Sequence, residues 1–155
     1  MNIGRFLLTA SAAFAALAAP VAAKPDYSGD IKADYDKSLG ALWDHFHRNP
    51  ELSFREFKTA ARMAQELRAI PGMVVTEKVG QTGVVGVLKN GDGPVVLVRA
   101  DMDGLPVQER SGYANASTVR QVGVDGLEMP VMHACGHDVH ITSLVGTARQ
   151  LARLK

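Results

Sequence analysis

The segment Met132–Thr142, with the sequence MHACGHDVHIT, carries the residues best suited to chemistry. It places Cys135, the only cysteine of the chain, among three of the five histidines, namely His133, His137 and His140. Thiolate sulfur and imidazole nitrogen are preferred ligands of zinc-like ions. Residues 133, 135 and 137 point to one side of an extended segment, and 137 and 140 share a face if a helix follows. The spacing therefore predicts part of a metal site.

Two aspartates form a second chemical group. Asp101 and Asp103 follow the apolar run Pro94–Ala100, PVVLVRA, which is typical of a strand covered on both faces of a sheet. Ligands of α/β proteins bind beyond the carboxyl ends of strands, so carboxylates at this position are well placed. The alternative is an ordinary turn after a strand, in which the Asp-x-Asp-Gly pattern is common.

Together the two segments supply carboxylate oxygens, imidazole nitrogens and one thiol. This mixture suits a zinc- or manganese-type centre in which carboxylates bridge ions or orient ligands. Cys135 could also be a buried inert thiol or an intermolecular link, but its histidine neighbours favour a metal-bound thiolate. His140 could equally be a solvated helix residue. None of the nearby acidic residues stands out as an isolated glutamate base for hydrolysis.

The first residues predict export. Arg5 precedes an apolar, alanine-rich stretch, and Val21-Ala22-Ala23 suits a signal peptidase, so residues 1–23 are expected to be a signal peptide. The stretch is too short to span a membrane. The whole chain has 17 basic and 16 acidic residues. Loss of Arg5 balances these charges, which argues against nucleic-acid or anionic-membrane partners.

The remaining sequence, from Lys24 to Lys155, predicts one α/β unit with no internal repeats. A long polar loop is expected over Leu105–Pro130, and Asp138 is a candidate N-cap for the last helix. His45 and His47 are expected to be mainly structural. The predicted elements are a helix over Asp30–His47, a helix that begins at Ser53 with a capping box to Glu56, strands over Met73–Val79, Thr82–Leu88 and Pro94–Ala100, and a helix over Val139–Leu151.

Three segments resemble the aminoacylase/carboxypeptidase family of two-metal hydrolases. RADMDGLPVQE (Arg99–Glu109) and MHACGHDVH (Met132–His140) are similar to its two amino-terminal signatures. HRNPELSFREFKTA (His47–Ala60) is similar to the early segment of the branch that contains hippurate hydrolases and indole-acetyl-amino-acid hydrolases. The resemblance runs from about Trp43 to Lys155. It implies the amino-terminal part of a zinc-peptidase-like catalytic domain, in which helices flank a mixed sheet.

The resemblance also implies an activity, which is cleavage of an amide bond in N-acyl-amino acids or small peptides with two zinc or manganese ions. Cys135 and His137 match metal ligands of that family, and Asp103 matches an aspartate that orients a metal-binding residue. Asp101 stands where other branches carry a histidine ligand. Asp101, His133, Asp138 and His140 are therefore expected to support the ligands rather than to bind metal, since a ligating histidine needs a partner that fixes its tautomer.

The family's catalytic glutamates, further histidine ligands and smaller inserted domain, which also pairs subunits, are expected beyond position 155. Consistent with this, the sequence ends within an amphipathic pattern, LVGTARQLARLK. The chain is therefore expected to be an inactive amino-terminal fragment of a periplasmic or extracellular enzyme that can form a homodimer when complete. The alternative is an exported, non-catalytic metal-binding or interaction module derived from such an enzyme.

Overall fold

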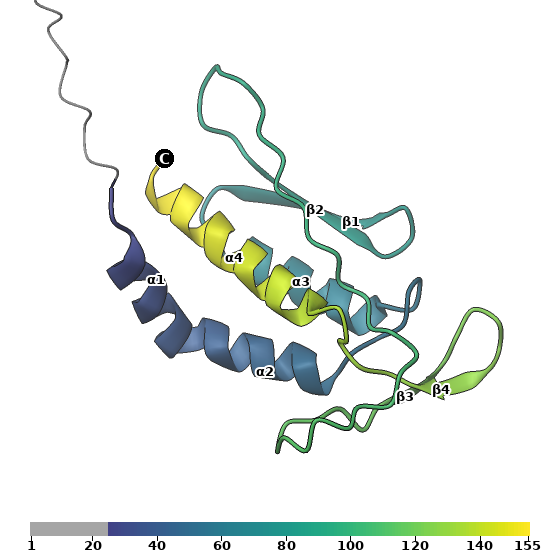
Figure 1. Cartoon of the computed structure of the whole chain (residues 1–155). Coiled ribbons are helices and arrows are strands. Elements are labelled where there is room, and N and C mark those ends of the chain that lie inside the picture. The colour runs from purple at the N-terminus through teal and green to yellow at the C-terminus, as the bar shows by residue number, and fades with distance from the viewer. Residues whose placement is uncertain (1–24) are drawn as a thin grey trace, which may run out of the picture.

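The computed structural model describes residues 25–155 (Figure 1). The predicted signal peptide, residues 1–23, lies outside the described residues. No helix within residues 25–155 has the length and apolar character needed to cross a membrane. The chain order is α1 (Ser28–Asp34), a π-helical segment η1 (Tyr35–Leu39), α2 (Gly40–Arg48), α3 (Phe57–Arg68), β1 (Met73–Val79), β2 (Gly83–Leu88), β3 (Arg120–Val122), β4 (Glu128–Pro130) and α4 (His137–Arg153).

The core lies between the helices. α1, η1 and α2 follow one another without a break, which confirms the helix predicted over Asp30–His47. α4 packs against both α2 and α3, and α3 also contacts the β1–β2 hairpin (Figure 1). Apolar residues that recur at helical spacing meet in this layer and remove their surface from water. The buried cluster consists of Leu39, Leu42, Phe46, Met63, Ile141 and Val145.

The start of α3 differs from the prediction. The helix begins at Phe57, and no side chain of its N-cap residue forms a capping hydrogen bond, so the predicted capping box at Ser53 is wrong. Instead, the carboxylate of Glu51 accepts hydrogen bonds from the backbone N–H groups of Lys58 at 3.2 Å and Thr59 at 2.7 Å. A carboxylate at this end satisfies orphan donors and also faces the positive end of the helix dipole.

The strands of the described residues form two separate antiparallel pairs. β1 pairs with β2, as the valine-rich pattern predicts, with Met73 opposite Leu88. β3 pairs with β4 inside the predicted loop, with Arg120 opposite Pro130. The α/β class is therefore confirmed, but these residues contain no mixed sheet.

The segment Pro94–Ala100 is not a buried strand, which corrects a further prediction. It has no ladder partner among the described residues, and the side chains of Val95 and Leu97 are 97% and 84% exposed. An apolar strand becomes buried only when neighbouring strands and covering helices remove it from water. Residues 25–155 supply no such neighbours for this segment.

Candidate metal centre

Backbone hydrogen bonds of the residues that follow Asp103 hold it next to the segment before α4. The N–H of Gly104 donates to the carbonyl oxygen of Glu51 at 2.6 Å, and Leu105 exchanges backbone hydrogen bonds with Met132 at 2.8 and 3.1 Å. A Cβ on Gly104 would approach a side-chain carbon of Val131 to 2.8 Å, so a larger residue does not fit there. This close packing brings the segment after Ala100 beside the segment that leads into α4.

The result is a pair between Asp103 and His137, the first residue of α4. Nδ1 of His137 lies 3.0 Å from Oδ1 of Asp103 and 2.9 Å from its backbone oxygen. Because both partners are acceptors, Nδ1 is the nitrogen that donates to them, and Nε2 is the nitrogen left for a metal. The second carboxylate oxygen of Asp103 accepts a hydrogen bond from the hydroxyl of Ser53 at 2.8 Å. This arrangement is typical of a ligating histidine whose tautomer is fixed by a carboxylate.

Cys135 lies on a turn, not on the extended segment in which residues 133, 135 and 137 would point to one side. The N–H of Gly136 donates to the carbonyl oxygen of His133 at 3.1 Å, and Gly136 adopts a left-handed conformation with φ of 73° just before α4. Glycine accepts this conformation without steric cost. Cys135 is exposed and forms no disulfide, which excludes a buried inert thiol.

The turn separates His133 from Cys135. His133 is 6% exposed, and neither ring nitrogen has a hydrogen-bond partner among the described residues. Burial lowers the pKa of His133, the carboxylate of Asp138 opposes this, and the rings of His137 and His47 lower the pKa further. The side chain at 133 is thus buried and the side chain at 135 is exposed, with a backbone turn between them.

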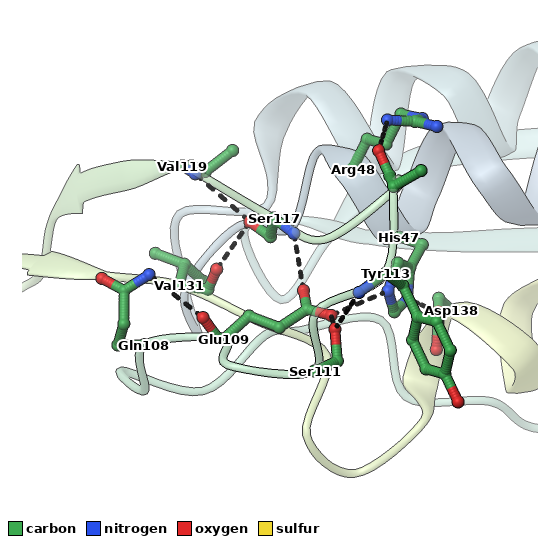
Figure 2. A network of polar contacts seen from close by, with 11 residues as sticks. His47, Arg48, Gln108, Glu109, Ser111, Tyr113, Ser117, Val119, Val131 and Asp138 are labelled. Atoms are coloured by element: carbon green, nitrogen blue, oxygen red, sulfur yellow. Dashed lines mark hydrogen bonds and ion pairs between the residues drawn. The ribbon is translucent and has the colours of Figure 1, made fainter.

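Asp138 is not the N-cap of α4, which is Gly136. Its carboxylate instead lies 2.7 Å from Nδ1 of His47, and Nε2 of the same ring lies 3.3 Å from Oε1 of Glu109 (Figure 2). The prediction that Asp138 supports the site remains open, but its partner was missed because a lone helical histidine is usually structural. The signal that could have found His47 is its place at the start of HRNPELSFREFKTA.

Glu109 is the buried end of this network. Its carboxylate accepts hydrogen bonds from the hydroxyl of Ser111 and the backbone N–H of Ser117, both at 2.6 Å. Burial raises the pKa of Glu109, but these two hydrogen bonds and the facing His47 lower it more, so the net pKa lies below the ordinary value of 4.5. The carboxylate is therefore held in its charged form.

The two remaining candidates lie at the periphery. Asp101 forms an ion pair with Arg99, whose side chain is exposed. His140 is exposed on the first turn of α4, with its ring centroid 5.4 Å from that of His137. The environment of His140 agrees with the alternative of a solvated helix residue.

The donor set fits a divalent metal in type but not in number. The exposed thiol of Cys135 and the free Nε2 of His137 are suitable ligands for zinc-like ions. Residues 25–155 nevertheless bring no three histidine, cysteine, aspartate or glutamate side chains together in a group that could hold an ion. The sequence prediction of a metal site is thus represented by two candidate ligands and one orienting aspartate.

Known proteins resemble this chain in sequence and in fold. Hippurate hydrolase of Campylobacter jejuni is 42% identical over 79% of this chain, and thermostable carboxypeptidase 2 of Saccharolobus solfataricus is 44% identical over 70%. The crystal structure of the Bacillus subtilis YxeP protein, described as a dinuclear metal binding peptidase from the M20 family, covers 79% of this chain with a TM-score of 0.67 and 34% identity.

The chain spans only part of these proteins, namely 29% of the Campylobacter protein, 26% of the Saccharolobus protein and 32% of the YxeP chain. The family model described as Peptidase family M20/M25/M40 matches residues 97–155, which include both candidate ligands and Asp103. The sequence signatures, the matched segment and the shared fold agree in relating this chain to Peptidase family M20/M25/M40.

Proposed function

We propose that the full-length protein is a metal-dependent hydrolase that cleaves amide bonds in N-acyl-amino acids or small peptides. The observation that carries this proposal is the Asp103–His137 pair, which leaves Nε2 of His137 available two residues after the exposed Cys135. Relatives named hippurate hydrolase and IAA-amino acid hydrolase support an acylated amino acid as the substrate class. The relative named carboxypeptidase supports small peptides.

In this proposal Cys135 and His137 bind the metal, and Asp103 orients the imidazole of His137. A divalent metal supplies Lewis-acid chemistry, which polarises a carbonyl and lowers the pKa of water toward about 7. The carboxylate of Asp103 fixes the tautomer and the direction of the ring. Asp101, His133, Asp138 and His140 support these groups. The remaining ligands and the glutamate that transfers the proton are expected in sequence outside this chain.

We further propose that the complete site holds two ions, zinc or manganese. A solved relative is described as dinuclear, which supports the number but not the element. Thiolate and imidazole suit zinc, whereas carboxylate-rich surroundings suit manganese. The choice depends on ligands that residues 25–155 do not bring together.

The predicted leader, residues 1–23, supports a proposal of export to the periplasm or the medium, with no membrane attachment after cleavage. A homodimer is proposed for the full-length protein from the family resemblance alone. The near balance of 17 basic and 16 acidic residues supports a small-molecule substrate rather than a nucleic acid.

The test is an assay of a full-length protein, loaded with zinc or manganese, for release of amino acid from N-benzoylglycine and other N-acyl-amino acids. We expect release that a chelator abolishes and that added metal restores. Stoichiometric metal binding without cleavage of any acyl-amino acid or dipeptide would contradict the proposed activity. The 155-residue chain assayed alongside should show no measurable hydrolysis.

The second candidate is a non-catalytic metal-binding or interaction module. The observation in its favour is that residues 25–155 contain no cluster of three suitable donors. The reading frame downstream of Lys155 separates the two candidates. A stop codon there favours the module, and a continued frame with further histidines and a glutamate pair favours the hydrolase.

A further inference from the structure

A buried polar chain connects three segments that lie far apart in sequence. It runs from the backbone N–H of Ser117 through the carboxylate of Glu109 and the ring of His47 to the carboxylate of Asp138 (Figure 2). The side chains of Glu109 and Asp138 are only 2% and 3% exposed, and that of His47 is 15% exposed. α2, the loop after Leu105 and the first turn of α4 are thereby joined at one point.

This polar network is costly to bury unless every hydrogen bond in it is made. Two carboxylates removed from water require polar partners, and the imidazole between them presents one ring nitrogen to each. A side chain with a single polar atom cannot reach both carboxylates in this way. Ser111 and the backbone of Ser117 satisfy the rest of Glu109. The first turn of α4 also favours a negative charge at Asp138.

The position of Asp138 connects this network with the candidate metal centre. Asp138 directly follows His137, so the first turn of α4 is held on one residue by Asp103 and on the next by His47. α4 has no side-chain cap at its start, because its N-cap residue is the left-handed Gly136. The position of its first turn therefore depends on contacts from outside the helix.

We infer that His47 is a positioning residue that acts through Asp138 to hold the Cys135–His137 turn in its metal-binding geometry. The inference rests on the proposed metal centre. It differs from a purely stabilising role in one respect, which is that loss of His47 should loosen the first turn of α4 and weaken metal binding more than it changes the rest of the fold.

The experiment compares the wild-type chain with His47→Ala, His47→Gln and the matched control His45→Ala. His45 lies two residues earlier on the same helix, is exposed, and its side chain takes no part in the network. The first measurement is amide hydrogen exchange of the metal-free chain. Loss of one charge-assisted hydrogen bond is worth about tenfold or more in a local opening equilibrium. We therefore expect amide exchange about tenfold faster or more at residues 139–142 in His47→Ala, and no change in exchange at residues 149–152.

The second measurement is a Co²⁺ titration of the full-length protein and of the same variants in it, followed by the absorption that a bound Cys135 thiolate produces. Loss of a partner behind the ligands weakens metal affinity by roughly 10–100-fold. We expect about tenfold weaker binding in His47→Ala, a partial effect in His47→Gln, and none in His45→Ala. Glu109→Gln is a second variant for the case that His47→Ala does not fold. Its amide oxygen still accepts from His47, so a smaller loss of affinity is expected.

The outcomes are separable. Equal cobalt affinity in wild type, His47→Ala and Glu109→Gln would overturn the inference and leave the metal centre intact. Faster exchange along all of α4, rather than in its first turn, would also overturn it in favour of a purely stabilising role. A full-length wild-type protein that binds no cobalt would contradict the metal centre itself, and the exchange data would still decide whether His47 holds the first turn.

Discussion

The carboxylate of Asp103 lies 3.0 Å from Nδ1 of His137, although 34 residues separate the two in sequence. Backbone pairing of Leu105 with Met132 brings the two segments together and aims the carboxylate at the ring. The pair fixes which nitrogen of His137 is free. Chemistry at this site therefore depends on a contact that local sequence pattern does not contain.

Asp103→Asn should weaken metal binding at His137 by roughly 10–100-fold, the usual effect of removing the carboxylate behind a ligating histidine. An asparagine amide keeps the size of the side chain but removes the charge that stabilises the Nδ1 proton. Calorimetric titration of the full-length protein with Zn²⁺ measures the metal affinity, and circular dichroism checks that the helices of the variant remain folded.

Ser53→Ala is the control for this variant, because it removes only the hydroxyl that donates to the second oxygen of Asp103 at 2.8 Å. A loss smaller than that of Asp103→Asn is expected. Zinc affinity that is unchanged in both variants would show that Asp103 does not orient the ligand.

Glu109 should make the free energy of unfolding depend on pH. Its folded pKa lies below 4.5, so its contribution is complete above the pKa of the unfolded state and is lost as the pH falls through the folded pKa. Wild type should therefore exceed Glu109→Gln in stability at about pH 7, and the gap should narrow toward about pH 3.5. Urea unfolding at each pH measures it.

His47 faces Glu109 at 3.3 Å, so the His47→Ala/Glu109→Gln double variant completes the test. The two changes should be less than additive, because both act on the same contact between His47 and Glu109. A stability gap between wild type and Glu109→Gln that widens on acidification would contradict the assigned direction of the pKa.

Phe46→Ala should destabilise the fold by about 3–5 kcal/mol, since deletion of a buried aromatic ring leaves a cavity. Phe46 is 1% exposed in the cluster that joins α2, α3 and α4. Leu127→Ala, at a position that is 64% exposed, should change stability by less than about 0.5 kcal/mol. Chemical unfolding measures both, and similar values for the two would show that the helical layer is not the core.

Val96→Lys should reduce self-association of the 155-residue chain. Val96 is 80% exposed in the segment Pro94–Ala100, which has no ladder partner among the described residues. Such an extended apolar segment offers unpaired backbone groups to another chain, and a lysine discourages this pairing. Sedimentation velocity should show more monomer in Val96→Lys. The same lysine at Val124, which is 66% exposed outside the segment, should have little effect.

The sequence predicted those elements whose order is local. The helix around Leu42 and Phe46 and the strands after Met73 follow from periodicity alone, and both are present. The start of α3 was predicted wrongly, because the residue that caps it is Glu51 and not Ser53. Glu51 lies outside the helix, and its carboxylate accepts a hydrogen bond from the backbone N–H of Thr59. The buried strand over Pro94–Ala100 failed for a different reason, since burial is a property of the neighbours and not of the strand.

The site was predicted by residue type better than by geometry. Spacing pointed to Cys135 and His137, but it could not show that the backbone turns between His133 and Gly136. Nor could it show that Asp138 is engaged by a histidine 91 residues earlier in the chain. Long-range partners of this kind depend on how α2, the loop and α4 pack together.

We propose that Cys135 and His137 bind a divalent metal, and X-ray absorption of the zinc-loaded full-length protein detects these two ligands directly. We expect one sulfur neighbour at about 2.3 Å and imidazole nitrogen at about 2.0 Å. The sulfur signal should disappear in Cys135→Ser, which leaves the fold intact because Cys135 is exposed. Bound zinc with no sulfur neighbour in the wild-type protein would show that Cys135 is not a metal ligand.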